Sequence, residues 1–250
     1  MKVVRTVGEM KAERAEDTGL VPTMGALHAG HVSLLEAARR ENGHVVMSLF
    51  VNEAQFSSAD DFARYPRDEQ RDLELAERVG VDVVFAPAAD ELYPPGFRTW
   101  VEPDEHGLEA DHRPGHFRAV ATVCVKLFNI VRPRRAYFGQ KDAQQVDVVR
   151  RMIRDLNLDV ELRVLPTVRD ADGLALSSRN ALLTPEQREQ ALALRRALQT
   201  RHPARARELL NGIDVDYVEI ADFEPRVLAG AIRVGSVRLI DNVTLEGEDE

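Results

Sequence analysis

The stretch that most constrains the fold runs from Pro22 to His31 and reads P-T-M-G-A-L-H-A-G-H. The apolar residues Leu20 and Val21 lead into it, and an amphipathic run follows it. This order predicts a strand, a glycine turn and the first turn of a helix. Glycine lets backbone approach a ligand closely, and the free N–H groups of a helix N-terminus bind anions. We therefore expect a phosphate site here, with Gly25 and Gly30 allowing the close approach.

Two histidines, His28 and His31, lie at the start of the predicted helix. Residues one turn apart share a helix face, so both imidazoles would reach the same anion. A metal pair and a pair of surface histidines beside an ordinary turn are the alternatives. Metal-binding histidines on a helix are usually four residues apart with a carboxylate nearby, so the spacing favours a nucleotide-triphosphate site.

Apolar strands alternate with amphipathic helices up to about residue 165. The near-continuous apolar run at 44–51 is typical of a strand covered on both faces. This alternation predicts a Rossmann-like, doubly wound parallel α/β sheet with ligands at the carboxyl ends of its strands. Residues 1–18 are expected to be helical or irregular, and 90–116 to be a long irregular, functional connection. Further strands are expected at 81–85, 135–138 and 160–164, and helices at 31–42, 68–79, 117–131 and from 142 to about 156.

The pattern changes near residue 166. Thr184, Pro185 and Gln187 form a helix N-cap, a proline at the first helical position and a capping-box partner. Helices are expected at 184–199 and 203–212, and strands at 216–220, 231–234 and 237–240. We predict a Rossmann-like nucleotide- and substrate-binding domain over 1–165 and a smaller C-terminal α+β lid domain over 166–250.

Composition narrows the functional class. The net charge of −9 argues against a general nucleic-acid-binding protein, which needs a basic surface. The single Cys124 excludes an intrachain disulfide and is expected to be a buried small hydrophobe. No apolar run approaches the roughly 18 residues that cross a bilayer, and the charged N-terminus lacks a signal-peptide core. We expect a cytoplasmic protein that binds neither membrane nor nucleic acid.

Three further polar segments follow predicted strands. Asn52 and Gln55 suit a polyhydroxy or carboxylate ligand, although as isolated residues they are more often turn formers. Lys141 could bind phosphate oxygens, but taken alone it is more typical of an exposed surface lysine, with Asp142 beside a helix N-terminus. The segment at 176–180, Leu-Ser-Ser-Arg-Asn, fits a phosphate clamp and a cap-and-turn loop equally well.

Taken together, these segments resemble the pantothenate synthetase (pantoate–β-alanine ligase) family of the nucleotidyltransferase superfamily, which carries HIGH-type motifs. The likeness extends from about Leu20 to Leu245. The matching motifs are P-T-M-G-A-L-H-x-G-H at 22–31, F-V-N-x-x-Q-F at 50–56, Y-P-R at 65–67, G-H-F-R at 115–118, A-Y-F-G-x-K-D at 136–142 followed by Gln144 and Gln145, D-G-L-A-L-S-S-R-N at 172–180 and R-L-I-D-N at 238–242.

The resemblance implies a ligase that condenses (R)-pantoate with β-alanine to give pantothenate, AMP and diphosphate through a pantoyl-adenylate. It implies ATP as a substrate, Mg²⁺ bound mainly by the triphosphate, and a homodimer. His31, in the position assigned a catalytic acid role, would act with His28 and Lys141. Gln55 would hold pantoate and later β-alanine, and Gln145 would hold pantoate. The ATP site would comprise Met24, Gly25, Ala26, Leu27, His28, Ala29, Gly30, His31, Gly139, Gln140, Lys141, Asp142, Val168, Leu176, Ser177, Ser178 and Arg179.

Four positions depart from the family pattern: Glu53 replaces a proline, Ala119 a glycine, Gln140 a glutamate and Ala143 an aromatic residue. Glu53 would place negative charge near anionic pantoate. Asp72 is a weak candidate for a carboxylate that supports the metal. One rival hypothesis is adenylyl transfer to another small carboxylate. The other is a nucleotide-binding interaction module that has lost catalysis.

Overall fold

The computed structural model describes residues 1–245, and residues 246–250 of the predicted second domain lie outside the described part. Its larger sheet has six strands in the order β1-β4-β3-β2-β5-β6, and every neighbouring pair is parallel. The order reverses between β2 and β5, so their carboxyl ends form the switch point at which such sheets bind ligands. The strands are β1 (Lys2–Val4), β2 (Thr18–Thr23), β3 (His44–Leu49), β4 (Val83–Phe85), β5 (Arg135–Gly139) and β6 (Glu161–Leu165).

Both faces of this sheet are buried, as the apolar strands predict. Along β5, Ala136 and Phe138 join one hydrophobic cluster and Tyr137 joins the other, because successive side chains point to opposite faces. Helices α1 (Val7–Ala12), α7 (His116–Val131) and α8 (Ala143–Asp155) cover the first face, while α2 (Ala29–Glu41) and α4 (Glu69–Val79) cover the second. Cys124 is buried on α7, which confirms its expected role.

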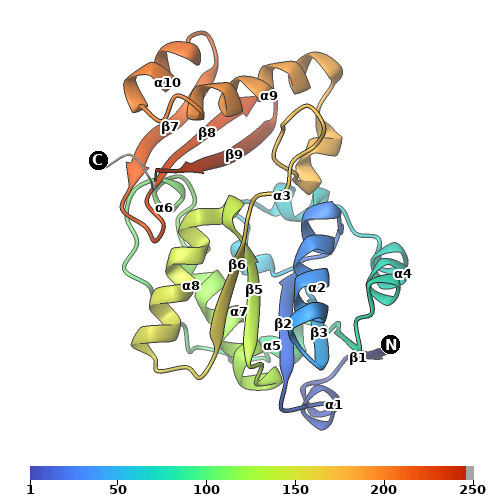
Figure 1. The fold of residues 1–250 in the computed structure, drawn as a ribbon. Coiled ribbons are helices and arrows are strands. Elements are labelled where there is room, and N and C mark those ends of the chain that lie inside the picture. The colour runs from blue at the N-terminus through green and yellow to red at the C-terminus, as the bar shows by residue number, and fades with distance from the viewer. Residues whose placement is uncertain (246–250) are drawn as a thin grey trace.

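A smaller unit lies over the carboxyl ends of the sheet (Figure 1). It consists of α9 (Pro185–Leu198), α10 (Pro203–Leu209) and an antiparallel sheet of β7 (Asp214–Ala221), β8 (Val227–Val234) and β9 (Val237–Thr244). Its separate core includes Leu194 and Leu198 of α9 packed against Leu228 and Ile232 of β8. The predicted fold class is confirmed, whereas the domain boundary at 165/166 stays a prediction.

Several short elements were not expected from the sequence. Residues 2–4 form edge strand β1, which pairs with β4, where a helical or irregular segment was predicted. The connection at 90–116 overlaps α5 (Ala89–Leu92) and contains α6 (Glu109–His112), and α3 (Ala59–Arg64) was also missed. Elements this short carry too little periodicity to be recognised locally, because their stability comes from the partners they pack against. Within residues 1–245 no helix is long and apolar enough to cross a membrane.

Candidate active site

The glycine turn after β2 is held by a carboxylate from α4. Asp72 accepts hydrogen bonds from the backbone N–H of Ala26 at 2.8 Å and of Leu27 at 2.8 Å, one on each oxygen. Gly25 has φ +81°, and a Cβ there would lie 2.8 Å from Asp72 Oδ2. Asp72 therefore shapes the turn. Burial raises its pKa, although the two N–H groups oppose that rise.

The structure shows a further reason for glycine at two positions of this motif, and the expected close approach of a ligand stays a prediction. At Gly25 the constraint is the positive φ together with contact with Asp72. At Gly30 a Cβ would lie 2.9 Å from Cε1 of the His28 ring, so the missing side chain makes room for an imidazole. Both glycines are explained by contacts within the protein.

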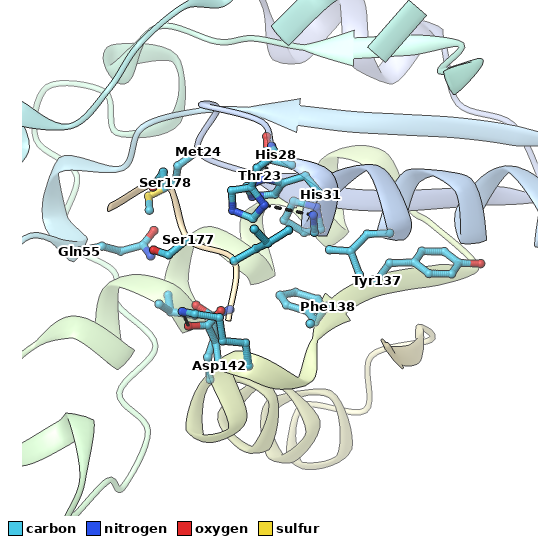
Figure 2. Close-up of a pocket in the computed structure, with 18 of the residues that line it drawn as sticks. Thr23, Met24, His28, His31, Gln55, Tyr137, Phe138, Asp142, Ser177 and Ser178 are labelled. Carbon is cyan, nitrogen blue, oxygen red and sulfur yellow. Dashed lines mark hydrogen bonds and ion pairs between the residues drawn. The ribbon is translucent and has the colours of Figure 1, made fainter. Parts of the chain in front are cut away.

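The two histidines form the N-terminal cap of α2. His28 is the N-cap residue, and its Nδ1 accepts from the N–H of Gly30 at 3.1 Å. Nδ1 of His31 accepts from the N–H of His28 at 3.3 Å. Because a neutral imidazole carries one proton, both rings must bear it on Nε2. The ring centroids are 4.2 Å apart, so the two imidazoles lie together as predicted (Figure 2).

Both histidines are neutral at physiological pH. Burial, followed by the charge of Lys141, lowers the pKa of His28, and burial with His28 and Lys141 nearby lowers that of His31 to about 3. A neutral ring with its proton on Nε2 can still donate to a phosphate oxygen. His31 is therefore a hydrogen-bond donor without positive charge.

A cavity of about 250 Å³ opens at the carboxyl ends of β2 and β5. Figure 2 shows side chains from both halves of the chain around it, including His31 of α2, Phe138 of β5 and Ser177. It collects most of the predicted residues: Met24, His28, Gly30, His31, Gln55, Gly139, Lys141, Asp142, Gln145, Val168, Leu176, Ser177, Ser178 and Arg179.

Five predicted ATP-site residues are not among the residues that line this cavity: Gly25, Ala26, Leu27, Ala29 and Gln140. The first three belong to the turn held by Asp72, and Ala29 begins α2. The Gln140 carbonyl accepts a hydrogen bond from Asn242 of β9. These residues support the wall of the cavity, and their direct contact with ATP stays a prediction.

Lys141 and Arg179 supply positive charge to the cavity. The Lys141 side chain is 19% exposed, which rules out its interpretation as an exposed surface lysine, and its nearest carboxylate is Asp142 at 3.8 Å. Arg179 donates to Asp61 at 3.2 Å. Ser177 caps the short 3-10 helix η3 (Ser178–Leu182), which confirms the cap-and-turn interpretation. It also lines the cavity, and the phosphate clamp stays a prediction.

Two glutamines approach the cavity from different elements. Gln55 ends the 3-10 turn η1 (Glu53–Gln55), and its Oε1 accepts from Asn52 Nδ2 at 2.9 Å. Gln145 lies in the first turn of α8. Two glutamines that line one cavity suit a ligand that has both hydroxyl and carboxylate groups.

The departures from the family pattern lie away from the cavity surface. Glu53 is exposed and is not among the lining residues. Ala119 is buried, and its carbonyl accepts from Asn52 at 3.4 Å. Ala143 packs between the two units beside Tyr217 and Ala229.

The sequence did not predict the polar contacts that hold the smaller unit in place. Asn242 donates to the carbonyls of Gln140 at 2.9 Å and Lys141 at 3.0 Å. Beside it, Arg169 of the segment that joins the two units forms a two-pronged ion pair with Asp241, with N···O distances of 2.7 and 2.9 Å. The available signal was the R-L-I-D-N motif, whose Asp and Asn make these contacts.

The cavity offers few ligands for a metal of its own. In the described part of the chain, no group of three or more His, Cys, Asp or Glu side chains is arranged to hold a metal ion. Asp142 is the single carboxylate among the lining residues, and both oxygens of Asp72 are occupied by the turn. One carboxylate fits Mg²⁺ that is bound mainly through substrate phosphates.

Comparison with known proteins gives a consistent match. A family model described as Pantoate-beta-alanine ligase matches residues 2–244. Pantothenate synthetase from Moorella thermoacetica is 49% identical over 100% of both chains, and that from Chloroflexus aurantiacus is 51% identical over 99% of each. The crystal structure of pantothenate synthetase from Thermus thermophilus superposes with a TM-score of 0.94 at 45% identity, covering 98% of this chain and 99% of that one.

A further solved structure carries ligands. It is pantoate-beta-alanine ligase from Francisella tularensis, complexed with beta-gamma ATP and beta-alanine. It has a TM-score of 0.87 and 34% identity, and the match covers 99% of this chain and 98% of that one.

Proposed function

The chain belongs to the pantoate-beta-alanine ligase family, and from this premise we propose that it uses ATP to join (R)-pantoate and β-alanine through a pantoyl-adenylate. The observation that carries the proposal is the cavity at the switch point. It brings together the paired imidazoles, Lys141, the Ser-Ser-Arg segment and two glutamines, although these segments are far apart in sequence. The ATP complex of the Francisella relative supports the choice of nucleotide.

In the first half-reaction, a carboxylate oxygen of pantoate bonds to the α-phosphorus while the bond from that phosphorus to the bridging oxygen breaks, releasing diphosphate. The carboxylate is ionised at neutral pH, so no base is required. The protein must align the reactants and stabilise negative charge on the phosphates. We assign this stabilisation to Nε2–H of His28 and His31, Nζ of Lys141 and the guanidinium of Arg179.

Gln55 and Gln145 are assigned to pantoate because both residues line the same cavity. Mg²⁺ carried by the triphosphate would neutralise further phosphate charge, and Asp142 is the lining carboxylate that would approach it. In the second half-reaction the β-alanine amine bonds to the acyl carbon, the acyl–phosphate C–O bond breaks, AMP leaves and the amine loses a proton.

Exchange of labelled diphosphate into ATP tests the proposal, measured with Mg²⁺ and without β-alanine. We expect exchange that requires D-pantoate and is lost in Lys141→Ala but kept in Lys11→Ala, which removes an exposed lysine of α1. ATP binding without exchange under pantoate would overturn the proposal. Exchange with another carboxylate would then indicate a different adenylyl transfer. If no carboxylate supports exchange, the chain is a nucleotide-binding module without catalytic activity.

The family resemblance also leads us to propose a homodimer. Sedimentation equilibrium of the purified chain tests this directly, since a monomer has a mass of 28.0 kDa. A single species at twice that mass is the expected result, and a monomer at micromolar concentration would contradict it.

A further inference from the structure

A group of charged residues lies between the small sheet and the pantoate side of the cavity. Glu109 of α6 is 7% exposed at its side chain, and Arg238 of β9 is 17% exposed. The two terminal guanidinium nitrogens of Arg238 donate to the two carboxylate oxygens of Glu109, each at 2.7 Å, and its Nε donates to Asp216. The hydroxyl of Tyr217 in β7 donates to Oε1 of Glu109 at 3.0 Å. Three hydrogen bonds from the smaller unit therefore fix one carboxylate of the larger unit.

This carboxylate is ionised. Burial alone would raise the pKa of Glu109, but the hydrogen bonds and charge of Arg238 leave it below the usual value. A buried carboxylate with this geometry is stable only while its partner is in place. The position of Glu109 therefore depends on how the small sheet is seated.

The next residue in the chain of contacts is Arg113, which ends α6 and lines the cavity. One of its terminal nitrogens lies 3.8 Å from Glu109 Oε2. The other donates to the backbone carbonyl of Gln55 at 3.3 Å. The Arg113 side chain thus joins Glu109 to the segment proposed to bind pantoate.

A second donor reaches the same carbonyl. Nδ1 of His116, at the start of α7, lies 3.0 Å from the oxygen of Gln55, and since a carbonyl only accepts, the proton is on Nδ1. The Gln55 side chain is held separately by Asn52. A three-residue turn with no side-chain capping hydrogen bond is therefore oriented largely by groups outside it.

We propose that Glu109 and Arg238 are positioning residues for pantoate, acting through Arg113 on Gln55, so that seating of the small sheet sets pantoate affinity. This inference rests on the proposed function, because it uses Gln55 as a pantoate-binding residue. Neither Glu109 nor Arg238 lines the main cavity. The hydrogen bonds and ion pairs of the ATP-side groups His28, His31 and Lys141 within residues 1–245 go to other partners.

The test compares Glu109→Gln and Arg238→Met with the wild type in the pantoate-dependent exchange assay. We expect the KM for pantoate to rise about tenfold, as loss of a charged hydrogen bond implies, while the KM for ATP stays within about twofold. Arg226→Met is the control. Arg226 pairs with Asp222 at 2.9 Å, apart from the group formed by Glu109, Arg238 and Asp216, so its loss should leave both KM values unchanged.

The double variant Glu109→Leu with Arg238→Met separates positioning from folding. This variant removes the buried Glu109–Arg238 pair as a whole, and Asp216 keeps its contact with Arg233, so thermal stability should recover in part relative to either single variant. The pantoate KM should stay raised, because Arg113 still lacks its carboxylate. Recovery of KM together with stability would overturn the proposal, as would an equal rise in both KM values.

Glu109→Asp provides a second route if Glu109→Gln does not fold. It keeps the charge but shortens the side chain by one methylene, so the contact to Arg113 lengthens and the pantoate KM should again rise selectively. If the wild type catalyses no diphosphate exchange, the proposed function is rejected. Wild-type exchange with unchanged pantoate KM in all the Glu109 and Arg238 variants would reject the positioning role alone.

Discussion

In each of the paired histidines the two ring nitrogens differ, because Nδ1 accepts a backbone hydrogen bond and Nε2 carries the proton. In His28, Nδ1 caps α2 by accepting from Gly30, and Nε2 carries the proton available to a ligand. Asparagine is a good N-cap residue but cannot reproduce the Nε2–H group in the cavity. Cap and ligand donor can therefore be separated by substitution.

His28→Asn should fold with a melting temperature close to that of the wild type but lower the rate of diphosphate exchange by about 10²-fold, the cost of removing one preorganised donor. His28→Ala should lose the donor and also about 1 kcal/mol of stability with the cap. Thermal melts run beside exchange assays check both. An active His28→Asn variant would show that the imidazole serves only as a cap.

Buried histidines also make the fold sensitive to acid. The pKa of His31 is lowered from 6.5 to about 3 by burial with His28 and Lys141, and that of His116 to about 4 by burial and Arg113. Glu109, Asp142 and the Gln55 carbonyl oppose the shift at His116. Below pH 6.5 the histidines of the unfolded chain bind protons that those of the folded chain do not. Their contribution to the free energy of unfolding is therefore fully present above pH 6.5 and is lost progressively as the pH falls toward 3.

At pH 5 each of these two histidines should contribute about 2 kcal/mol to the loss of unfolding free energy relative to pH 7.5. Urea unfolding at both pH values measures this loss. His31→Gln should show a smaller loss than the wild type, whereas His106→Ala, which removes an exposed imidazole, should match the wild type. Equal losses in all three proteins would contradict the assignment.

Among the elements, the turn between β2 and α2 depends most on a distant partner. Asp72 comes from α4, 45 and 46 positions beyond the two N–H groups that it holds. Sequence reasoning singled out Asp72 only as a possible metal support, because nothing local relates α4 to the turn. The turn itself was predictable, since glycines between an apolar run and an amphipathic run indicate one directly.

Gly25→Ala should destabilise the protein by about 2 kcal/mol or more, because it adds a steric clash to an unfavourable positive φ. The Cβ would lie 2.8 Å from Asp72 and 2.9 Å from Leu49 Cδ1. Gly96→Ala is the matched control, since Gly96 has φ +86° with nothing within 4 Å of a Cβ. The difference in unfolding free energy between the two variants isolates the clash, and equal values would remove Asp72 from the explanation.

For the whole molecule, local sequence predicts the layers but not how the two units meet. Alternating burial along β5 follows from side-chain periodicity, which is visible in any window of the chain. Glu109 and Arg238, in contrast, are 129 positions apart and meet only after both units have folded. Motif resemblance located most of the cavity, while the contacts that support it required the tertiary structure.

Asn242→Ala should weaken the seating of the smaller unit. Its amide donates to two carbonyls of the 3-10 turn η2 (Gln140–Asp142). Truncation removes both hydrogen bonds and should lower the free energy of unfolding by about 2 kcal/mol. We expect a lower melting temperature and slower exchange, because Lys141 belongs to this turn. Asn211→Ala, an exposed position, should leave both quantities unchanged. Normal exchange in Asn242→Ala would show that Lys141 is positioned without β9.

The strand order also determines which edge of the sheet stays unpaired while the chain is being synthesised. Strands β1 to β4 are complete once Phe85 has been synthesised, and they can pair without any later segment. Strand β2 then remains an open edge until β5 arrives about 50 residues later, roughly five seconds at about 10 residues per second. An unpaired apolar edge is a template for aggregation. Nascent chains stalled between Phe85 and Arg135 should therefore be the ones that require a chaperone, and they should lack the cavity at the switch point.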